Sequence, residues 1–486
     1  MSIPSYPQIH QYIAGRWVEG SGATVEQVLD PATEQVLGSY RHASPADIDA
    51  ALIAADQALP LWRGHTAEAR YQILRTAAGL LRQRSEEAAA ILSLEQGKPL
   101  SESRMEIQVS ADVLDWYAEE GRRAYGRVIP GAANSRLLVV NEPIGAVAAF
   151  TPWNFPGTTV ARKLGGALAA GCTAIIKASE ETAATAVIIF ECLEQAGLPA
   201  GVANLLLGIP AEISTRLLSS NVIRKVSLTG SLAVGRVLGH LAVDNDLVTT
   251  MELGGNAPVI VFDDVDVEAV ARLCVTAKFR NAGQVCNVPS RFYVHERIAE
   301  RFAVTVQAFA RELRVGPGIE AGTQMGPLAN VRRLAVMQQL VDDAQQRGAD
   351  LLAGGKRLQR AGYFFEPSVL ANVPDAARVL VEEAFGPIMP ITTFSDRDEV
   401  LFRANNTPYG LGAFVFTESL DHATYVSDVL EAGMVGVNTT VLSRTETPFG
   451  GIKASGHGFE SGIEGLEAYL RKKVILQHPP VRGAAR

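Results

Sequence analysis

From Asn141 onward, short apolar runs alternate with amphipathic segments, and this alternation constrains the fold more than any other feature of the chain. Apolar runs of four to eight residues between turn residues are typical of strands that are buried on both faces. The pattern predicts strands at "IGAVAAF", "TAIIKAS", "VANLLLG", "RKVSLTG" and "APVIVF", with helices over 158–170, 181–196, 211–219 and 231–243. Such strand–helix alternation indicates a parallel α/β sheet.

The flanking regions extend this pattern. Residues 44–119 are predicted to be almost wholly helical, with a helix cap at "SPADIDAALIAADQAL" and a break at "EQGKPL". Helices are also predicted over 266–282, 298–313 and 331–347, and strands resume at "YFFEPSVLANV" and "GAFVFT", which suggests a second α/β lobe. The tail "AYLRKKVILQHPP" ends in a β-like run without a following partner. It is therefore expected to join a sheet elsewhere in the chain or on another subunit.

Size and composition narrow the class of protein. A chain of 486 residues with 47% hydrophobic and 20% charged residues predicts a folded protein of two or three domains. A net charge of −8 argues against a partner that is a nucleic acid or an anionic membrane. The longest apolar stretch, Leu164 to Ile176, is too short to span a bilayer, and the first twenty residues do not resemble a signal peptide. A cytoplasmic location is expected.

The four cysteines are spaced too irregularly for a CxxC metal site or a disulfide framework, so we expect reduced thiols and no metal. Cys286 lies in the polar turn "KFRNAGQVCNVPSR". A catalytic cysteine needs a lowered thiol pKa or a nearby base, and access to substrate. Gly283 allows close backbone approach, and the end of a predicted helix offers N–H groups to an oxyanion. A buried spectator thiol is the alternative.

Three other segments carry candidate functional groups. Glu252 in "MELGGNAP" ends a predicted strand and is a candidate general base. Asn154 in the rigid loop "FTPWNFP" is a candidate amide donor to a developing negative charge. Gly230 and Gly235 in "SLTGSLAVG" straddle a strand-to-helix junction that suits a phosphate. Taken singly, each could be an ordinary surface carboxylate or turn. The chain has no GxxxxGK[ST], GxSxG or HExxH motif, so kinase, α/β-hydrolase and zincin functions have no support.

Together, these segments resemble one family. "TPWNFP", "ELGGNAP", "FRNAGQVC", "EEAFGP", "PYGL" and "PFGGIKASG" follow the order found in the NAD(P)-dependent aldehyde dehydrogenase superfamily, and the resemblance runs from "IAGRWVEG" onward. It implies that Cys286 attacks the aldehyde to form a thiohemiacetal, whose oxyanion is held by the Asn154 side chain and the Cys286 backbone N–H. Hydride transfer to the nicotinamide then gives a thioester, and Glu252 activates the water that releases the acid.

The resemblance also implies a cofactor site. Lys177 and Glu180 of "KASE" match contacts to the adenosine ribose, Gly230 and Ser231 match contacts to the pyrophosphate, and the "EEAFGP" segment matches contacts to the nicotinamide riboside. The full implied set is Thr151, Pro152, Trp153, Lys177, Ser179, Glu180, Gly208, Gly230, Ser231, Leu253, Glu383 and Phe385. Because the carboxylate of Glu180 would repel a 2′-phosphate, NAD is the expected cofactor and NADP the second candidate.

Members of this family have an α/β fold of three domains, and the resemblance implies the same here. A Rossmann-like cofactor domain is expected over 1–121 and 141–253, and an α/β catalytic domain over 254–453. A small β oligomerisation domain is expected from 122–140 and 470–486. The family also implies a small-molecule aldehyde as substrate and a homodimer or homotetramer.

Within the family, "WYAEEGRRAYGRVIPG" looks like the succinate-semialdehyde dehydrogenase branch. Arg162, Arg280 and Ser443 match the positions that grip the distal carboxylate of the substrate there. "KASEET" and "GIPAEIS" are also similar to 2-oxoglutarate-semialdehyde (2,5-dioxopentanoate) dehydrogenases, which gives a second candidate substrate. Two alternatives are a CoA-acylating enzyme, which typically lacks the glutamate of "ELGG", and a non-catalytic relative, which would have lost the Cys–Glu–Asn set. This chain has Glu252 and the whole set, so the sequence favours a hydrolytic aldehyde dehydrogenase over both. Val288 replaces the second cysteine that serves as a redox switch in some relatives.

Overall fold

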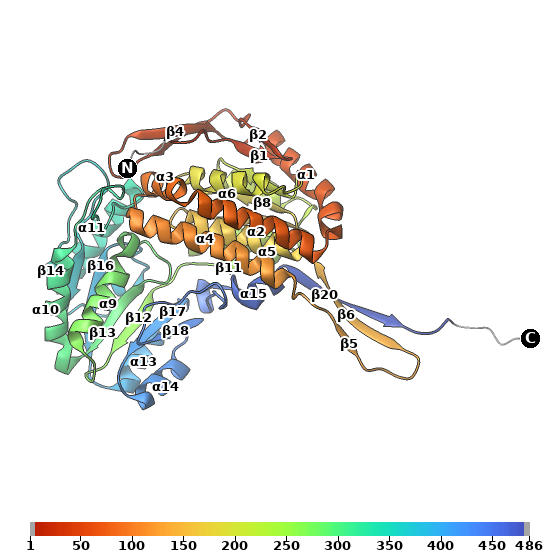
Figure 1. Ribbon diagram of the computed structural model, residues 1–486. Helices are drawn as coiled ribbons and strands as arrows, with labels where there is room; N and C mark the ends of the chain where they lie inside the picture. The colour runs from red at the N-terminus through yellow and green to blue at the C-terminus, as the bar shows by residue number, and fades with distance from the viewer. Residues whose placement is uncertain (1–4, 481–486) are drawn as a thin grey trace, which may run out of the picture.

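A computed structural model describes residues 5–480 of the protein (Figure 1). These residues form two large sheets with helices packed against them, and a three-stranded arm that projects from one end. A separate hairpin joins β3 (Val25–Leu29) to β4 (Val36–Arg41). No helix in the described part of the chain is both long and apolar enough to cross a membrane.

The first sheet contains most of the predicted strands. Its order within residues 5–480 is β19-β11-β10-β7-β8-β9-β1-β2, and the five strands from β11 to β9 are parallel. The strands are β1 (Gln11–Ile13), β2 (Arg16–Val18), β7 (Ala146–Phe150), β8 (Ala174–Lys177), β9 (Ala203–Leu206), β10 (Ile223–Thr229), β11 (Val248–Glu252) and β19 (Gly456–His457). β7, β8 and β9 are buried along their whole length, as their apolar runs predict.

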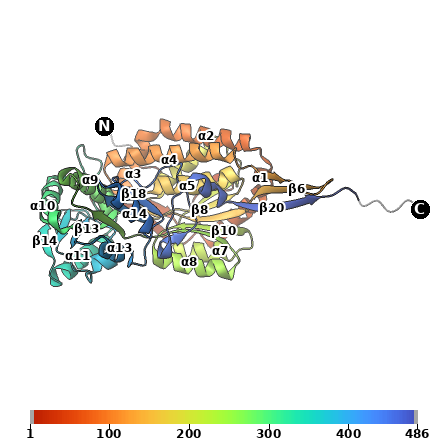
Figure 2. The same ribbon diagram turned by 90° about the horizontal axis from the view of Figure 1, so that it is seen from below.

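Helices cover both faces of the first sheet. Figure 2 shows α2, α4 and α5 on one side of the strands and α7 and α8 on the other. The helices of this lobe are α1 (Pro45–Gly64), α2 (Ala67–Gln83), α3 (Ser85–Gln96), α4 (Leu100–Gly121), α5 (Pro156–Ala170), α6 (Ala183–Gln195), α7 (Pro210–Leu218) and α8 (Leu232–Asp244). The predicted cap at Ser44 is a capping box with Asp47, and the break at "EQGKPL" separates α3 from α4. The predictions for α5 to α8 are confirmed within two residues at each end.

The second sheet has the order β14-β15-β16-β13-β12-β17-β18 among the described residues. Its strands are β12 (Ala257–Val261), β13 (Pro289–His295), β14 (Asp350–Ala353), β15 (Ser368–Ala371), β16 (Ile388–Phe394), β17 (Gly412–Phe416) and β18 (Met434–Val437). Its helices are α9 (Val267–Phe279), α10 (Glu296–Glu312), α11 (Val331–Gln346), α12 (Arg378–Val381), α13 (Arg397–Asn405) and α14 (Leu420–Val429). β13 and β16, at its centre, have no counterpart among the predicted strands.

The C-terminal β-like run forms one strand of the three-stranded arm. β20 (Leu470–Gln477) runs antiparallel to β6 (Arg136–Pro143), which also pairs with β5 (Arg127–Ile129). The tail therefore joins a sheet of its own chain, as one of the two alternatives predicted. Before it lie the 3-10 turn η2 (Lys453–Ser455) and α15 (Gly462–Glu467). The three domain boundaries remain predictions, and their parts at 1–4 and 481–486 lie outside the described residues.

The helix predicted over 266–282 is wrong at its end. α9 stops at Phe279 and is followed by the 3-10 turn η1 (Arg280–Gly283), in which Asn281 and Ala282 have φ angles of 48° and 53°. Arg280 therefore lies at the end of the helix and not within it. Gly283 has a φ of 73°, and a Cβ atom there would lie 2.2 Å from the carbonyl oxygen of Gly386. The predicted close backbone approach at Gly283 is confirmed, and only glycine fits this turn.

Candidate active site

A cavity of about 610 Å³ opens at the carboxyl ends of the first-sheet strands and against the second lobe. Most of the predicted site residues line it: Pro152, Trp153, Asn154, Arg162, Gly230, Ser231, Glu252, Leu253, Arg280, Cys286, Glu383, Phe385 and Ser443. In this sheet the strand order reverses between β7 and β10, so the loops after these two strands diverge. Ligands of open α/β sheets bind at such a switch point.

The remaining predicted cofactor residues lie outside this cavity but at the same sheet edge. Thr151, Lys177 and Gly208 follow or end the adjacent parallel strands β7, β8 and β9, and the Thr151 backbone N–H donates to the Lys177 carbonyl at 3.2 Å. Lys177 Nζ donates to Glu180 Oε1 at 2.7 Å, and Ser179 Oγ donates to Glu181 at 2.7 Å. The strands thus bring the predicted adenosine and pyrophosphate contacts into one strip.

The polar groups of this strip fit a dinucleotide. The hydroxyls of Thr151 and Thr229 are buried, and neither has a hydrogen-bond partner within residues 5–480. Ser231 caps α8, whose N-terminus faces the cavity beside Gly230 and favours an anion. In the second lobe, burial raises the pKa of Glu383 to about 7, and its carboxyl accepts from the Gly255 backbone N–H at 3.1 Å. A nicotinamide dinucleotide, which accepts a hydride when bound, matches these donors and acceptors.

Cys286 lies in the turn between η1 and β13 and is half-buried. Its side chain packs against Leu411, Met434 and Phe449. Burial, and then the charge of Glu383, raises the pKa of the Cys286 thiol to about 12, although Arg162 opposes the shift. This shift disfavours the thiolate form of Cys286. The thiol has to lose its proton to a base as it attacks.

Glu252 is the candidate base. It ends β11, as predicted, and is buried with both carboxyl oxygens unpartnered among the described residues. Burial and the neighbouring Glu460 raise the pKa of Glu252 well above its ordinary value. Glu460 is itself paired with Lys163, whose Nζ lies 2.7 Å from its Oε1. A buried, unpaired carboxyl that faces the cavity suits general base catalysis once it is ionised.

Asn154 is held directly beside the cysteine turn. Its Nδ2 donates to the carbonyl of Gln284 at 3.1 Å, two residues before Cys286. Its own carbonyl accepts from Asn281 Nδ2 at 3.1 Å. Next to it, the rings of Trp153 and Phe385 meet edge to face with centroids 5.4 Å apart. The loop after β7 thus places an amide at the same point of the cavity as the thiol.

The two arginines and the serine that were predicted to bind the substrate all line the cavity. Arg162 is only 8% exposed, since α5 is buried along its whole length. Arg162 is therefore not a solvated residue on the surface of a helix. Its Nη2 donates to Ser443 Oγ at 2.8 Å, and its guanidinium lies 4.4 Å from the ring centre of Phe449. The guanidinium of Arg280 lies 5.5 Å from the ring centre of Phe155. Each of the two arginines therefore lies beside an aromatic ring that also lines the cavity.

The structure adds ionisable residues that sequence reasoning missed. Glu102 and Glu106 of α4 line the cavity near Arg280, and the Glu102 carboxyl accepts from the Asn281 backbone N–H at 2.8 Å. Arg333 holds the "EEAFGP" loop by donating to the carbonyls of Ala384 and Phe385. The sequence carries no local signal for these contacts, since each joins segments that are far apart along the chain.

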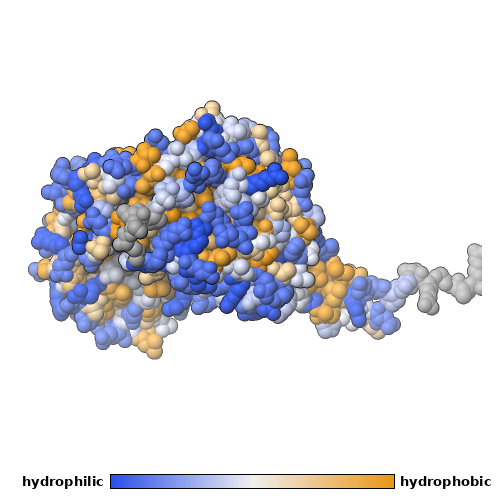
Figure 3. Space-filling view, turned by 45° about the horizontal axis from the view of Figure 1, so that its top comes forward, coloured by the Kyte–Doolittle hydropathy of each residue, from blue (hydrophilic) through white to orange (hydrophobic). Residues whose placement is uncertain are grey.

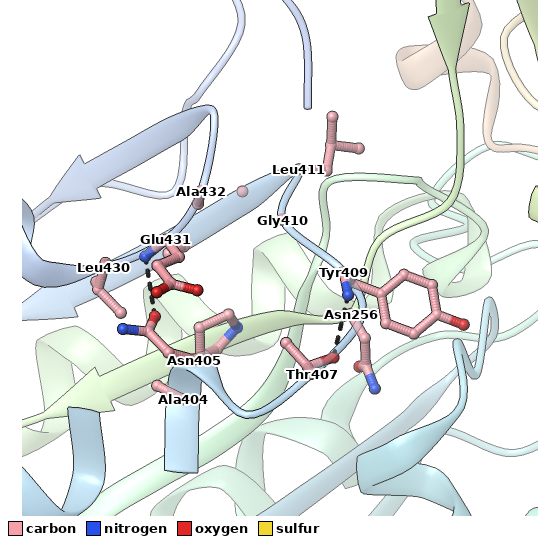
Figure 4. A pocket seen from close by; sticks show the side chains of 13 residues that line it. Asn256, Ala404, Asn405, Thr407, Tyr409, Gly410, Leu411, Leu430, Glu431 and Ala432 are labelled. Atoms are coloured by element: carbon pink, nitrogen blue, oxygen red, sulfur yellow. Dashed lines mark hydrogen bonds between the residues drawn. The ribbon is translucent and has the colours of Figure 1, made fainter. Parts of the chain in front are cut away.

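A second cavity has room for about one water molecule, at about 10 Å³, and is too small for an aldehyde or a dinucleotide. It lies between Asn256, Tyr409 and Glu431, with Asn405 accepting from the Glu431 backbone N–H (Figure 4). Within residues 5–480, no group of three or more His, Cys, Asp or Glu side chains is arranged to hold a metal ion.

The chain is similar in sequence to known aldehyde dehydrogenases. Residues 17–475 match the model of the aldehyde dehydrogenase family. The chain is 47% identical to 4-(hydroxymethyl)benzenesulfonate dehydrogenase TsaD1 of Comamonas testosteroni, over 98% of this chain and 99% of that protein. It is 41% identical to succinate-semialdehyde dehydrogenase [NADP(+)] GabD of Escherichia coli K12, over 95% and 96%.

Among solved structures, the chain resembles succinate-semialdehyde dehydrogenase from Burkholderia pseudomallei. The TM-score is 0.96 and the identity 41%, and the match covers 98% of this chain and 99% of that one. With the family model matching almost the whole chain, the α/β fold and the polar cavity at the switch point have one consistent explanation. The chain belongs to the aldehyde dehydrogenase family and is an NAD(P)-dependent oxidoreductase.

Proposed function

We propose that this enzyme oxidises an aldehyde that carries an anionic group at its other end, with succinate semialdehyde as the first candidate. The observation that supports this most is that Arg162, Arg280 and Ser443 line the same cavity as Cys286. Two guanidinium groups within an acidic protein provide a local site for a carboxylate, and arginine binds such planar anions with paired hydrogen bonds.

We assign the chemical steps to three residues. Cys286 Sγ attacks the aldehyde carbon and forms a C–S bond as the S–H bond breaks and the thiol proton passes to solvent water, and the Asn154 amide donates to the resulting oxyanion. Loss of the hydride converts the thiohemiacetal into a thioester. Ionised Glu252 then takes a proton from the attacking water, the C–S bond breaks, and the thiol is restored as the carboxylic acid leaves. Lys177, Glu180, Gly230, Ser231 and Glu383 would hold the dinucleotide that accepts the hydride.

Removing either guanidinium should weaken the reaction with anionic aldehydes selectively. A charge-assisted hydrogen bond contributes about 1.5–3 kcal/mol, so Arg162→Ala and Arg280→Ala should each lower kcat/KM for succinate semialdehyde by roughly 10- to 150-fold. Ser443→Ala should have a smaller effect, because the hydroxyl supplies a single hydrogen bond and no charge. Butyraldehyde, which has the same chain length without the carboxylate, should lose far less and serves as the internal control.

The assignment of an anionic substrate would be dropped if the three variants lowered kcat/KM equally for succinate semialdehyde and butyraldehyde. The arginines would then support the fold of the cavity rather than bind the substrate. The same panel should include 2-oxoglutarate semialdehyde, the second candidate from the sequence. Strong preference of the unmodified enzyme for that substrate would favour this alternative.

A third candidate comes from the relative TsaD1, whose name refers to a benzenesulfonate. A sulfonate is also an anion that a guanidinium can bind, and the rings of Phe155 and Phe449 beside the arginines offer contact surface to an aromatic stem. We therefore propose formylbenzenesulfonate as a further test substrate. A kcat/KM above that for succinate semialdehyde would make it the better description of the substrate class.

We propose that the enzyme prefers NAD to NADP because of Glu180. A 2′-phosphate 4 Å from its carboxylate would be repelled by about 4 kcal/mol at an effective dielectric of 20, before screening and side-chain rotation reduce it. Lys177, which pairs with Glu180 at 2.7 Å, offsets part of this repulsion. Measured kcat/KM should therefore favour NAD, and Glu180→Gln should narrow the difference.

Glu181→Gln is the matched control for this cofactor test. Its carboxyl is bound by Ser179 and Arg332, so its loss should change the NAD-to-NADP ratio less than the loss of Glu180. The relative GabD carries NADP(+) in its name, so a preference for NADP is the competing expectation. A higher kcat/KM with NADP in the unmodified enzyme would show that Glu180 does not set the preference.

We also propose that the chain forms a homodimer or homotetramer through its arm, while a cytoplasmic location remains a prediction. Figure 3 shows apolar residues on the arm, where it extends away from the body. Val128, Val474 and Leu476 of its strands are 72%, 64% and 63% exposed. Apolar strand residues that find no cover within their own chain favour burial against another copy.

A further inference from the structure

Two fully buried side chains of opposite charge, Lys98 and Glu106, meet at the wall of the cavity. Lys98 precedes α4 and Glu106 lies on it, and their side chains are 0% and 1% exposed. Lys98 Nζ lies 2.5 Å from Glu106 Oε2. A buried ion pair of this kind is weak evidence for stability, because the desolvation of two charges offsets their attraction.

Glu106 caps the helix that follows the Asn154 loop. Its Oε1 accepts from the Gly157 backbone N–H at 2.9 Å and from that of Thr158 at 3.4 Å, in the first turn of α5. Phe155, at the N-cap position, makes no side-chain capping bond within the described chain. A carboxylate on α4 thus supplies the cap that the helix itself lacks.

Lys98 holds the Asn154 residue directly. Its Nζ donates to the Asn154 carbonyl at 2.7 Å and lies 3.9 Å from the centre of the Phe155 ring. The same carbonyl also accepts from Asn281, and the Asn154 side chain donates to Gln284 in the cysteine turn. Asn154 is therefore fixed through its backbone by Lys98 and through its side chain by the turn that carries the thiol.

We infer that Lys98 and Glu106 are positioning residues that hold the Asn154 amide where the oxyanion forms. This inference rests on the proposed role of Asn154 as the oxyanion donor. An oxyanion donor acts by being fixed before the charge develops, and a misplacement of about 1 Å can slow a reaction by about 100-fold. A loop anchored through a buried ammonium and a capped helix meets this requirement.

The test is the rate of the first turnover, measured as NADH formed in a stopped-flow instrument with saturating NAD and aldehyde. Asn154→Ala should lower this rate by roughly 100- to 1,000-fold. Lys98→Met should lower it by about 10- to 100-fold, with little change in NAD affinity or in KM for the aldehyde. If Lys98 acts through Asn154, adding Lys98→Met to Asn154→Ala should cause little further loss.

Two variants separate positioning from simple loss of stability. Glu95→Gln is the matched control, since the buried Glu95 carboxyl caps α6 through the N–H groups of Ala184 and Thr185, away from the cavity. It should lower Tm without slowing the first turnover. Lys98→Met combined with Glu106→Gln leaves no unpaired buried charge and retains an acceptor for the α5 cap. This double variant replaces Lys98→Met in the rate measurement if the single variant does not fold.

The possible results distinguish the two proposals. An unchanged first turnover in Asn154→Ala would overturn the oxyanion role of Asn154, and the positioning role would fall with it. A slow Asn154→Ala enzyme beside a normal rate in the Lys98 variants would overturn only the positioning role. Fully multiplicative losses in the combined variant would also overturn it, because Lys98 would then act independently of Asn154.

Discussion

Cys286→Ala is expected to abolish aldehyde oxidation, with kcat at least about 10⁴-fold below that of the unmodified enzyme. The reason is that the thiol forms the C–S bond of both proposed intermediates, and no other cysteine lies on the cavity among the described residues. The fold and NAD binding should survive, since Cys286 lies in a half-buried turn. Steady-state NADH formation and a thermal melt measure the two effects.

Cys274→Ala is the matched control for this loss. Cys274 is fully buried on α9, and burial raises the pKa of its thiol well above the ordinary range. Its replacement leaves a small hole in the core, so it should lower Tm and leave kcat nearly unchanged. Near-normal turnover in Cys286→Ala would show that the reaction does not pass through this thiol.

Glu252→Gln is expected to slow the release of the acid by roughly 10²- to 10⁴-fold, the usual contribution of a general base. Hydride transfer should be less affected, so a burst of NADH equal to the first turnover should precede a slow steady state. In the unmodified enzyme the raised pKa of Glu252 also means that the active, ionised form accumulates as pH rises. The deacylation rate should therefore increase with pH, and Glu252→Gln should remove this increase.

Loss of the burst together with the steady-state rate would place Glu252 before the thioester. Its role would then be to accept the thiol proton, which the high pKa of Cys286 also requires of some base. The amplitude of the burst, measured in the same stopped-flow experiment, distinguishes the two roles. A control at high pH tests whether hydroxide restores release in the variant, as expected if only the base is missing.

The parallel core of the first lobe could be predicted because its signals are local. The apolar run "AIIK" of β8 follows α5, which ends at Gly171 in a left-handed conformation, so a few neighbouring residues mark this boundary. β13 and β16 were missed for the opposite reason. β13 begins at Pro289 directly after the cysteine turn, and β16 contains Pro390, and proline argues against a central strand in a single sequence.

The candidate site could be predicted only where a motif marked it. Resemblance placed Cys286, Glu252 and Asn154, and the structure brings all three to one cavity. In the sequence, Lys98 was assigned only to the helix break "EQGKPL" and had no predicted role. Its contact with Asn154 joins residues 56 positions apart, and no local pattern reveals such a contact. The end of α9 was missed because Asn281 and Ala282 adopt left-handed angles that a helical pattern does not reveal. Long-range contacts and backbone turns were therefore the part that pattern reasoning could not supply.

The most direct test of the account is to trap the thioester. Glu252→Gln enzyme is mixed with NAD and succinate semialdehyde, quenched in acid during the burst, and digested for mass spectrometry of the peptide that contains Cys286. The peptide that contains Cys286 should gain the mass of the acyl group, in an amount equal to the NADH formed. NADH formation with an unmodified Cys286 peptide, or with the acyl group on another residue, would contradict this expectation.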